Sequence, residues 1–352
     1  MKKYLFLLSG NNGATYIFNT SSWQNISTSL KFYRAYTLKA KVQKNILQCF
    51  LFVVGKFIPS VCRSKEDIKT YLKENINADV DFNLDSTSSV LISPTRDKVI
   101  VNHHEHYFHK FAFGKSFEKV KNENAIYESL QNAKEFQVAS VMDLKINEQL
   151  SSCNFKLVNP PVNTKDQLKT IDNLSELLVE FFNSSPNKKT VTLADYIADL
   201  FKRFHSLNME DINNLISYLA KIQKDYNAET MPLGLVHGDF KPWNILLRDT
   251  VLIFDFEEAI TDGPPIEDLL NYYIDPIIRY QSAIQVYDFL YSKEKQTEYT
   301  AYLKLLKVTV PFEVLLVIYM LERIIFWTKE EELETAMYYK NVLNHFLLNS
   351  QH

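Results

Sequence analysis

The pattern of the sequence changes at Asn159-Pro160-Pro161, and this change constrains the fold more than any other feature. Two consecutive prolines suit a stiff connector rather than the interior of a helix or strand. Before them lie short apolar runs separated by turn residues, such as Ser88–Ser93 and Val99–Asn102 around Pro94-Thr95-Arg96-Asp97. After them, apolar residues recur mostly at helical spacing. The sequence therefore predicts an α+β protein with a small mixed half and a larger, mainly helical half.

The individual elements follow from periodicity and turn residues. In the first half, strands are predicted over residues 4–8, 14–18, 88–93, 99–102, 106–113, 136–144 and 153–158. Helices are predicted over residues 36–58, 64–75 and 116–132, and in the second half over 165–183, 192–207, 211–226 and from 266 to the end. A polar segment from Gly234 to Pro265, with strand-like runs at 245–247 and 251–254, interrupts these helices.

The length suggests two domains or lobes at roughly 150 residues each. We place an N-terminal extension of unassigned role at residues 1–80, a small lobe at 81–160 and a large lobe at 161–352. Because 46% of the residues are hydrophobic, the chain can bury a sizeable core.

The charge and the cysteines exclude several classes of protein. A net charge of −3 gives no argument for a nucleic-acid partner. Three cysteines without a C-x-x-C fit a reducing compartment and neither a disulfide framework nor a zinc site. The apolar runs Ile46–Ile58 and Val314–Met320 are shorter than the roughly 18 residues of a membrane span. We therefore expect a cytoplasmic protein without a transmembrane segment.

Glycine is scarce, with seven residues in 352. The sequence contains neither G-x-G-x-x-G nor G-x-x-x-x-G-K-[ST], which excludes a dinucleotide-binding loop and a P-loop of those forms. Three of the seven glycines lie between Gly234 and Gly263. This clustering directs attention to the polar segment that interrupts the helices.

That segment contains the residues most able to carry chemistry. Asp239 follows an apolar strand in a tight loop, Asn244 lies where the chain enters the next strand, and Asp255 ends the return strand. A hairpin of this length brings Asn244 and Asp255 to the same end, beside Asp239. Carboxylate and amide oxygens without Cys or clustered His are ligands of a hard cation such as Mg²⁺. The remaining carboxylate, Asp239, would orient a hydroxyl nucleophile and accept its proton.

The segment resembles the catalytic loop of the aminoglycoside phosphotransferase and choline kinase superfamily, whose pattern is H-G-D-x-x-x-x-N followed by D-F-E or D-F-G. Here the pattern reads His237-Gly238-Asp239, Asn244 and Asp255-Phe256-Glu257. The resemblance implies that Asp239 is the catalytic base or the residue that positions the nucleophile, and that Asn244 and Asp255 bind Mg²⁺. It further implies that Asp268 braces the loop and that His237 shapes it. Lys241 would neutralise charge on the transferred phosphoryl group.

The same resemblance implies a protein-kinase-like bilobal fold, with a β-sheet-plus-helix N-lobe that binds nucleotide and a helical C-lobe. Such an N-lobe needs a strand lysine for the phosphates and a helix glutamate that holds it, which Lys110 and Glu123 provide, with Glu128 in reserve. The hinge around Leu157 and Asn159 would meet adenine. The hairpin over residues 88–98 would cover the phosphates, although it contains no glycine.

The implied function is transfer of the γ-phosphate of ATP, with Mg²⁺, to a hydroxyl of a small molecule. The partners are thus a nucleoside triphosphate and an acceptor that is a choline-like amino alcohol, a sugar or glycan, or an aminoglycoside. One alternative is a non-catalytic nucleotide-binding scaffold of the same fold. Another is a protein kinase, which Lys241 favours and the missing glycine loop and A-P-E segment oppose. The oligomeric state stays open.

Two further groups of residues have ordinary interpretations. The histidines of residues 103–109 more often form an exposed β-turn than a metal site, because no fourth ligand cluster is visible. The tyrosines and phenylalanines of residues 272–291 would allow an aromatic cage for an ammonium group, but core packing explains most of them. Asp275, Glu313 and Glu322 are candidates to face an amine. Leu315, Ile318, Leu321 and Ile325 form the core stripe of a helix.

Overall fold

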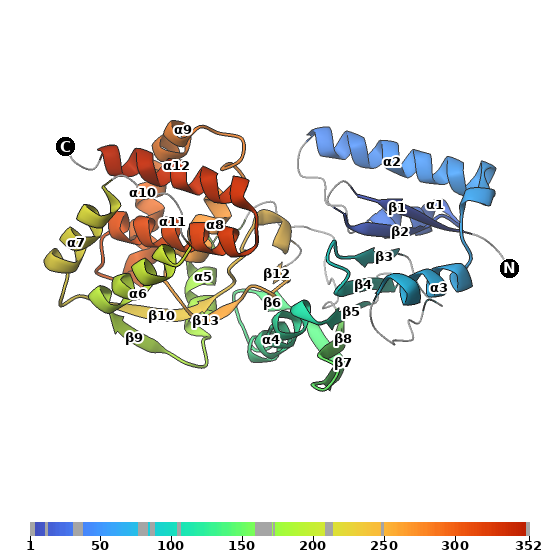
Figure 1. The fold of residues 1–352 in the computed structure, drawn as a ribbon, viewed down its shortest axis with the longest axis horizontal. Helices are drawn as coiled ribbons and strands as arrows, with labels where there is room; N and C mark the ends of the chain where they lie inside the picture. The colour runs from blue at the N-terminus through green and yellow to red at the C-terminus, as the bar shows by residue number, and fades with distance from the viewer. Residues whose placement is uncertain are drawn as a thin grey trace. The chain divides into compact units, whose positions relative to one another are not determined.

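The structure is a computed structural model that describes residues 4–10, 13–30, 38–76, 84, 89–103, 107–158, 171, 173–207, 214–247 and 250–349, with the backbone alone at 38–40. The chain divides into two compact units. The N-terminal unit contains residues 1–131 and 138–163, and the C-terminal unit contains residues 132–137 and 164–352. The predicted α+β class, an antiparallel sheet with helices followed by a mainly helical part, is confirmed (Figure 1).

The N-terminal unit is built on a seven-stranded sheet whose neighbouring strands are all antiparallel. In spatial order the strands are β1 (Leu5–Ser9), β2 (Thr15–Asn19), β3 (Ser89–Ile92), β4 (Lys98–His103), β5 (Tyr107–Phe113), β8 (Ser152–Val158) and β7 (Ser140–Asn147). These bounds confirm six of the predicted strands to within one residue at each end. The strand predicted over residues 136–144 is instead divided between a two-residue strand at 137–138 and β7. Because β2 pairs with β3, the sheet continues across residue 80, where the sequence predicts a boundary.

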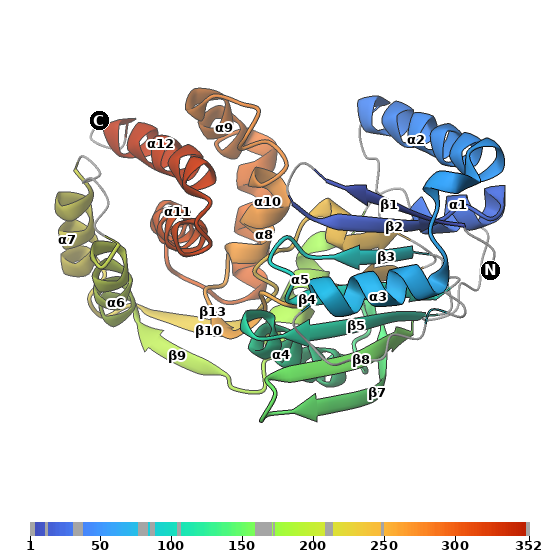
Figure 2. The same cartoon turned by 45° about the vertical axis from the view of Figure 1, so that its right-hand side comes forward.

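Helices cover both faces of this sheet. The helices are α1 (Trp23–Ser29), α2 (Leu38–Phe57), α3 (Lys65–Asn75) and α4 (Lys115–Ser129). A capping box between Ser64 and Asp67 starts α3, whose Ile68 and Leu72 join the core of one sheet face. On the opposite face, α1 and α2 pack against β1 and β2 (Figure 2). Residues paired across the strands share a face, so Lys110 faces away from α3.

The C-terminal unit is mainly helical. Its helices are α5 (Leu174–Asn183), α6 (Leu193–His205), α7 (Leu215–Asp225), α8 (Glu267–Ile274), α9 (Ala283–Leu290), α10 (Lys293–Leu305), α11 (Phe312–Lys329) and α12 (Leu333–Asn349). The stripe expected on α11 is buried, as are all residues from Val314 to Leu321. No described helix in either unit is long and apolar enough to cross a membrane.

Short strands position the polar segment from Gly234 to Pro265 within this unit. An antiparallel sheet contains β9 (Lys189–Thr192), β10 (Thr230–Val236) and β13 (Ile260–Gly263), while β11 (Ile245–Leu247) and β12 (Val251–Ile253) form the predicted hairpin. β6 (Gln137–Val138) is a two-residue strand. The sequence did not predict β9, and it placed Thr192 as the first residue of a helix. Thr192 instead ends β9 and caps α6, since its side chain accepts a hydrogen bond from the Asp195 backbone.

Candidate active site

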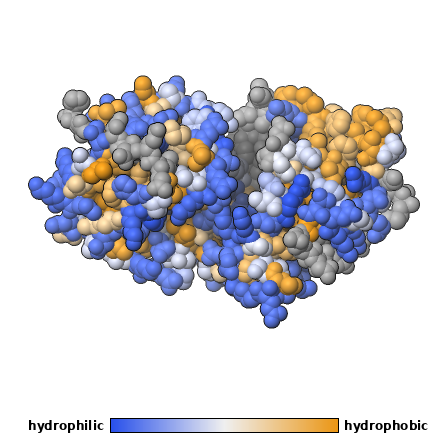
Figure 3. Space-filling view, viewed as in Figure 1, coloured by the Kyte–Doolittle hydropathy of each residue, from blue (hydrophilic) through white to orange (hydrophobic). Residues whose placement is uncertain are grey.

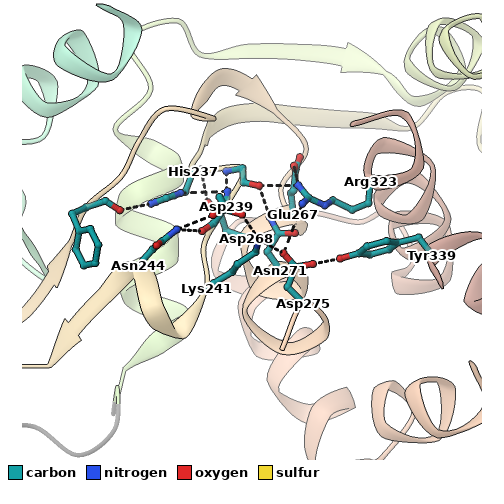
Figure 4. A network of polar contacts seen from close by, with 12 residues as sticks. His237, Asp239, Lys241, Asn244, Glu267, Asp268, Asn271, Asp275, Arg323 and Tyr339 are labelled. Atoms are coloured by element: carbon teal, nitrogen blue, oxygen red, sulfur yellow. Dashed lines mark hydrogen bonds and ion pairs between the residues drawn. The ribbon is translucent and has the colours of Figure 1, made fainter. Parts of the chain in front are cut away.

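The loop after β10 brings the chain into a sharp turn at Gly238. Its φ of +72° is in the left-handed region, and a Cβ there would lie 2.3 Å from the Glu258 carbonyl oxygen. Glycine is therefore required at this position on two independent grounds. Asp239 follows this turn, and its carboxylate contacts the side chains of Asn244 and Lys241 (Figure 4).

Asp268 at the start of α8 holds this turn through two backbone hydrogen bonds. Its Oδ2 accepts from the His237 N–H at 2.8 Å and its Oδ1 accepts from the Gly238 N–H at 3.2 Å. The brace that the resemblance implies is therefore present. Burial raises the pKa of Asp268 to about 6, and the two N–H donors oppose that rise because they stabilise the carboxylate.

His237 is buried and its ring links two parts of the segment. Nδ1 accepts a hydrogen bond from the Asp239 N–H at 3.3 Å, so Nε2 carries the proton and donates to the Phe254 carbonyl oxygen at 3.1 Å. The ring thereby joins the catalytic loop to the residue after β12. This geometry gives His237 the shaping role that the resemblance implies.

Asn244 holds the side chain of Asp239. Its Nδ2 donates to the Asp239 Oδ2 at 2.8 Å and to the Asp239 carbonyl oxygen at 2.9 Å. The Phe254 N–H donates to the Asn244 carbonyl oxygen at 3.2 Å, which continues the pairing of β11 with β12. The hairpin thus places Asn244 opposite the end of β12, beside Asp239, as the sequence predicts.

Asp255 follows directly on β12 with a φ of +71°, which is uncommon for a residue other than glycine. Its carboxylate and that of Glu257 each offer an oxygen, and these two oxygens lie within 4.8 Å of one another. An arrangement of carboxylate oxygens without sulfur or imidazole ligands suits Mg²⁺ rather than zinc. The donor set of the C-terminal unit therefore fits the expected metal, and Glu257 is an addition that the sequence motif alone did not assign.

Lys241 joins the catalytic loop to α8. Its ammonium forms an ion pair with Asp239 and a second with Asp275, whose Oδ2 lies 3.1 Å away. The same ammonium lies over the rings of Trp243 and Trp327, at 5.6 and 5.3 Å from their centroids. These two carboxylates and two indole rings together hold the Lys241 ammonium in place.

The electrostatics of Asp239 follow from these neighbours. Burial raises its pKa above the ordinary value, and the positive charge of Lys241 opposes that rise. A carboxylate of raised pKa is a stronger base than a solvated one, which suits a group that takes a proton from a hydroxyl.

Arg323 is a component of the site that sequence analysis missed. Its Nη1 donates to the Gly238 carbonyl oxygen at 2.8 Å, and its side chain is 1% exposed on α11. Nη1 lies 3.9 Å from Glu267 and Nη2 lies 3.7 Å from Asp275. Asp275 also accepts a hydrogen bond from Tyr339 on α12. The sequence signal for this role is an arginine within an otherwise apolar helix, because a buried arginine requires a hydrogen-bonding or charged partner.

The other acidic candidates have different partners. Glu322 accepts hydrogen bonds from Arg203 at 2.6 and 2.8 Å and from the Tyr196 hydroxyl at 2.7 Å. These contacts tie α6 to α11. Glu313 is exposed at the start of α11. Of the three residues suggested to face an amine, only Asp275 lies beside Asp239 and Lys241.

In the N-terminal unit, Lys110 and Glu123 form the predicted pair. The Lys110 ammonium on β5 donates to both carboxylate oxygens of Glu123 on α4, at 2.9 and 2.7 Å, and both side chains are buried. Leu157 is buried on β8. Asn159 lies outside the described residues, so its contact with adenine stays a prediction.

The histidines differ from the exposed turn that the sequence predicts. His103 is buried at the end of β4, and its ring stacks on Tyr107 at 4.4 Å between centroids. His109 shares a hydrogen bond of 3.1 Å with the Asn154 side chain, and burial lowers the pKa of His109. His104 and His106 lie outside the described residues. Packing of β5 against β4 therefore accounts for His103, and the pairing of β5 with β8 accounts for His109.

Comparison with families of known proteins tests the resemblance. A model described as "Phosphotransferase enzyme family" matches residues 95–299, more than half of the chain. The chain belongs to this phosphotransferase family. The match includes both the Lys110–Glu123 pair and the Asp239 loop. It confirms the suspected superfamily and the prediction that the protein is a phosphotransferase.

Solved structures similar to this phosphotransferase have low sequence identity. Choline kinase LicA from Streptococcus pneumoniae is 15% identical with a TM-score of 0.49, covering 81% of this chain and 99% of that chain. The GDP and kanamycin complex of the aminoglycoside phosphotransferase APH(2″)-IIIa is 13% identical with a TM-score of 0.49, covering 81% and 99%. No curated protein matches the phosphotransferase.

Proposed function

We propose that this phosphotransferase transfers the γ-phosphate of ATP, as its complex with Mg²⁺, to a hydroxyl of a small molecule. The acceptor classes are a choline-like amino alcohol, a sugar or glycan, and an aminoglycoside. The observation that carries the proposal is the position of the Asp239 carboxylate. It is held from one side by Asn244 and from the other by Lys241.

Asp239 orients the acceptor hydroxyl and takes its proton. Each carboxylate oxygen accepts more than one hydrogen bond, so the contacts with Asn244 and Lys241 leave capacity for the hydroxyl. The ammonium of Lys241 would neutralise negative charge on the transferred phosphoryl group. Because phosphoryl transfer has a loose transition state, correct positioning and charge stabilisation supply most of the rate enhancement.

The remaining residues have supporting roles in this proposal. Asn244 and Asp255 would hold Mg²⁺, with Glu257 as a further donor, and the bound metal would neutralise charge on the phosphates. Lys110, oriented by Glu123, would bind the nucleotide phosphates. Leu157 and Asn159 would contact the adenine. Asp268 and Arg323 hold the loop that carries Asp239 without contacting the substrate.

The test is turnover of Mg-ATP across a panel of amino alcohols, sugars and aminoglycosides, for the wild type and for Asp239→Asn. We expect kcat of the variant to fall by about 10²–10⁴-fold, the usual contribution of a general base. ATP affinity, measured by calorimetry, should stay within about twofold because the proposed phosphate contacts are elsewhere. Asp288→Asn, at an exposed position of α9, is the matched control.

Three outcomes would contradict the proposal. Equal turnover by wild type and Asp239→Asn would remove Asp239 from the reaction. ATP binding without phosphorylation of any acceptor would favour the non-catalytic scaffold. Phosphate on added protein substrates and on no small acceptor would identify a protein kinase.

A further inference from the structure

Helix α2 carries a stripe of exposed apolar side chains that takes no part in the core. Val42, Ile46, Phe50, Val53 and Phe57 are exposed by 50, 63, 48, 46 and 67%. They are spaced by four, four, three and four residues, so they share one side of the helix. The stripe is therefore a continuous apolar surface about 22 Å long, at 1.5 Å per residue.

The opposite side of α2 is the one that holds the helix to the protein. Leu51 and Val54 are buried there, and Leu47 and Phe52 pack against the core that contains Phe18. Gly55 permits this close packing, because a Cβ at that position would lie 2.5 Å from the Thr20 carbonyl oxygen. Since α2 is already anchored through this side, the exposed stripe is not needed for its folding.

The apolar surface extends beyond the stripe. Ile58 and Val61 are exposed just after α2, and Trp23 is exposed on α1, where its ring contacts Phe52 at 5.5 Å between centroids. Figure 3 shows a broad hydrophobic area where α2 lies. Contiguous apolar area of this kind marks an interaction surface on a protein.

The segment of sequence that contains the stripe carries charge of one sign. The first 65 residues contain ten Lys and Arg and no Asp or Glu, and the remaining 287 residues contain 29 basic and 42 acidic residues. The overall net charge of −3 therefore includes a segment, residues 1–65, whose net charge is +10. The α2 sequence contains four lysines and no acidic residue. Lys41 is exposed, and the Lys56 ammonium lies 5.5 Å from the Phe52 and Phe57 ring centroids.

We propose that α2 docks the protein on an anionic phospholipid membrane, lying parallel to the surface. The apolar stripe would enter the boundary between headgroups and acyl chains, and Lys41 and Lys56 would reach the phosphates. A helix packed on protein along one side cannot span the bilayer. Like charges disfavour a second copy of this strongly basic segment as the occupant. A nucleic acid would leave the apolar centre of the surface unused.

The test uses the full chain and flotation with vesicles of phosphatidylcholine alone or mixed with phosphatidylglycerol. We expect the wild type to float with the anionic vesicles, and to do so less at high salt. The vesicle partition coefficient should fall about tenfold or more in Ile46→Gln/Phe50→Gln and in Lys41→Glu/Lys56→Glu. The matched controls Ile284→Gln/Leu333→Gln and Lys224→Glu/Lys304→Glu change exposed residues elsewhere and should float like the wild type.

A second measurement needs no substitution in α2. Cys49 lies on the same side of the helix and is exposed, whereas Cys62 and Cys153 are buried. An environment-sensitive fluorophore on Cys49 should shift to shorter wavelength with anionic vesicles. This readout keeps the proposal testable if a variant fails to fold, as judged by circular dichroism.

The proposal is overturned if the wild type remains with the soluble fraction, or if the α2 variants float as the wild type does. A wild-type dimer that the Ile46→Gln/Phe50→Gln variant converts to monomer, without vesicle binding, would assign the stripe to a second copy. Retention on an oligonucleotide and not on vesicles would assign the surface to nucleic acid. Phosphotransfer is not a readout here, so this test is independent of the function proposed above.

Discussion

The ammonium of Lys241 lies 3.1 Å from Oδ2 of Asp275, a carboxylate at the C-terminal end of α8 whose side chain is 5% exposed. The same ammonium is paired with Asp239. One positive charge is therefore shared between the proposed base and a buried acid that also lies 3.7 Å from Arg323. Because Asp275 competes for Lys241, the protonation of Asp239 depends on residues outside the motif.

Replacing Lys241 should change the pH dependence of the reaction. Burial raises the pKa of Asp239 and Lys241 lowers it, so Lys241→Met should raise that pKa further. The base acts only when it is deprotonated, and the acid limb of kcat/KM should therefore move to higher pH. Initial rates at saturating ATP over a pH series measure the shift.

Lys295→Met provides the control for this experiment. Lys295 is buried in the same unit and pairs with Glu298 at 2.9 Å, without contact to the loop. Its loss should leave the acid limb in place. If the limb also stays in place in Lys241→Met, Lys241 does not set the protonation of Asp239.

Glu267 should make the stability of the protein depend on pH. Burial raises the pKa of Glu267 to about 8 in the folded state, whereas the ordinary value of 4.5 applies to the unfolded chain. Between these values the folded state keeps a proton that the unfolded state has lost. The stability that protonated Glu267 contributes is therefore fully present below pH 4.5 and is lost as the pH rises towards 8.

The variant Glu267→Gln removes this titration. Relative to wild type, its free energy of unfolding should increase with pH by up to about 1.4 kcal/mol per pH unit across that window. Urea unfolding at several pH values measures the difference. Glu294→Gln, at an exposed position of α10, is the control for removing a carboxylate at the surface. A constant difference for Glu267→Gln would contradict the raised pKa.

The Lys110–Glu123 pair should be strongly coupled. Glu123→Gln leaves the buried Lys110 ammonium without this carboxylate, which we expect to cost about 3–5 kcal/mol of stability. The double variant Lys110→Met/Glu123→Gln removes both charges and should be more stable than Glu123→Gln. Urea unfolding of these two variants, of Lys110→Met and of the wild type completes the cycle. Additive costs would show that the pair contributes no coupling energy.

Gly238→Ala should disable the catalytic loop. The new Cβ would lie 2.3 Å from the Glu258 carbonyl oxygen, so either the loop or its neighbour must move, and Asp239 moves with it. We expect kcat to fall by about 10²-fold or more, since small misplacements have that effect.

Gly114→Ala is the control for backbone strain alone. Gly114 also has a positive φ, of +50°, but a Cβ there has no atom within 4 Å. This variant should lose stability in thermal unfolding and retain the kcat of the folded enzyme. Equal losses of kcat in both variants would show that strain, rather than displacement of Asp239, is responsible.

Much of the fold and of the candidate site was accessible from the sequence, because the relevant contacts are local. His237, Asp239, Asn244 and Asp255 lie on one hairpin, whose length alone brings them together. Lys110 and Glu123 are 13 residues apart on a strand and the helix that follows it. Elements this close in the chain have few ways to pack.

Other features depended on segments distant in the chain. Arg323 reaches Gly238 across 85 residues, and Tyr339 reaches Asp275 across 64. The periodicity of α11 indicates a core helix and does not identify the carbonyl group that its arginine contacts. His103 was expected to be exposed, and its burial follows from stacking on Tyr107 in the neighbouring strand.

The sequence by itself determined which residues are the candidate reacting groups and their order along the chain. Backbone turns and strand lengths impose that arrangement over short distances. Only the tertiary structure decided which charges surround Asp239 and which side of α2 remains exposed. Both depend on the packing of distant helices and strands, whose burial changes the free energy of every charge and apolar group they cover.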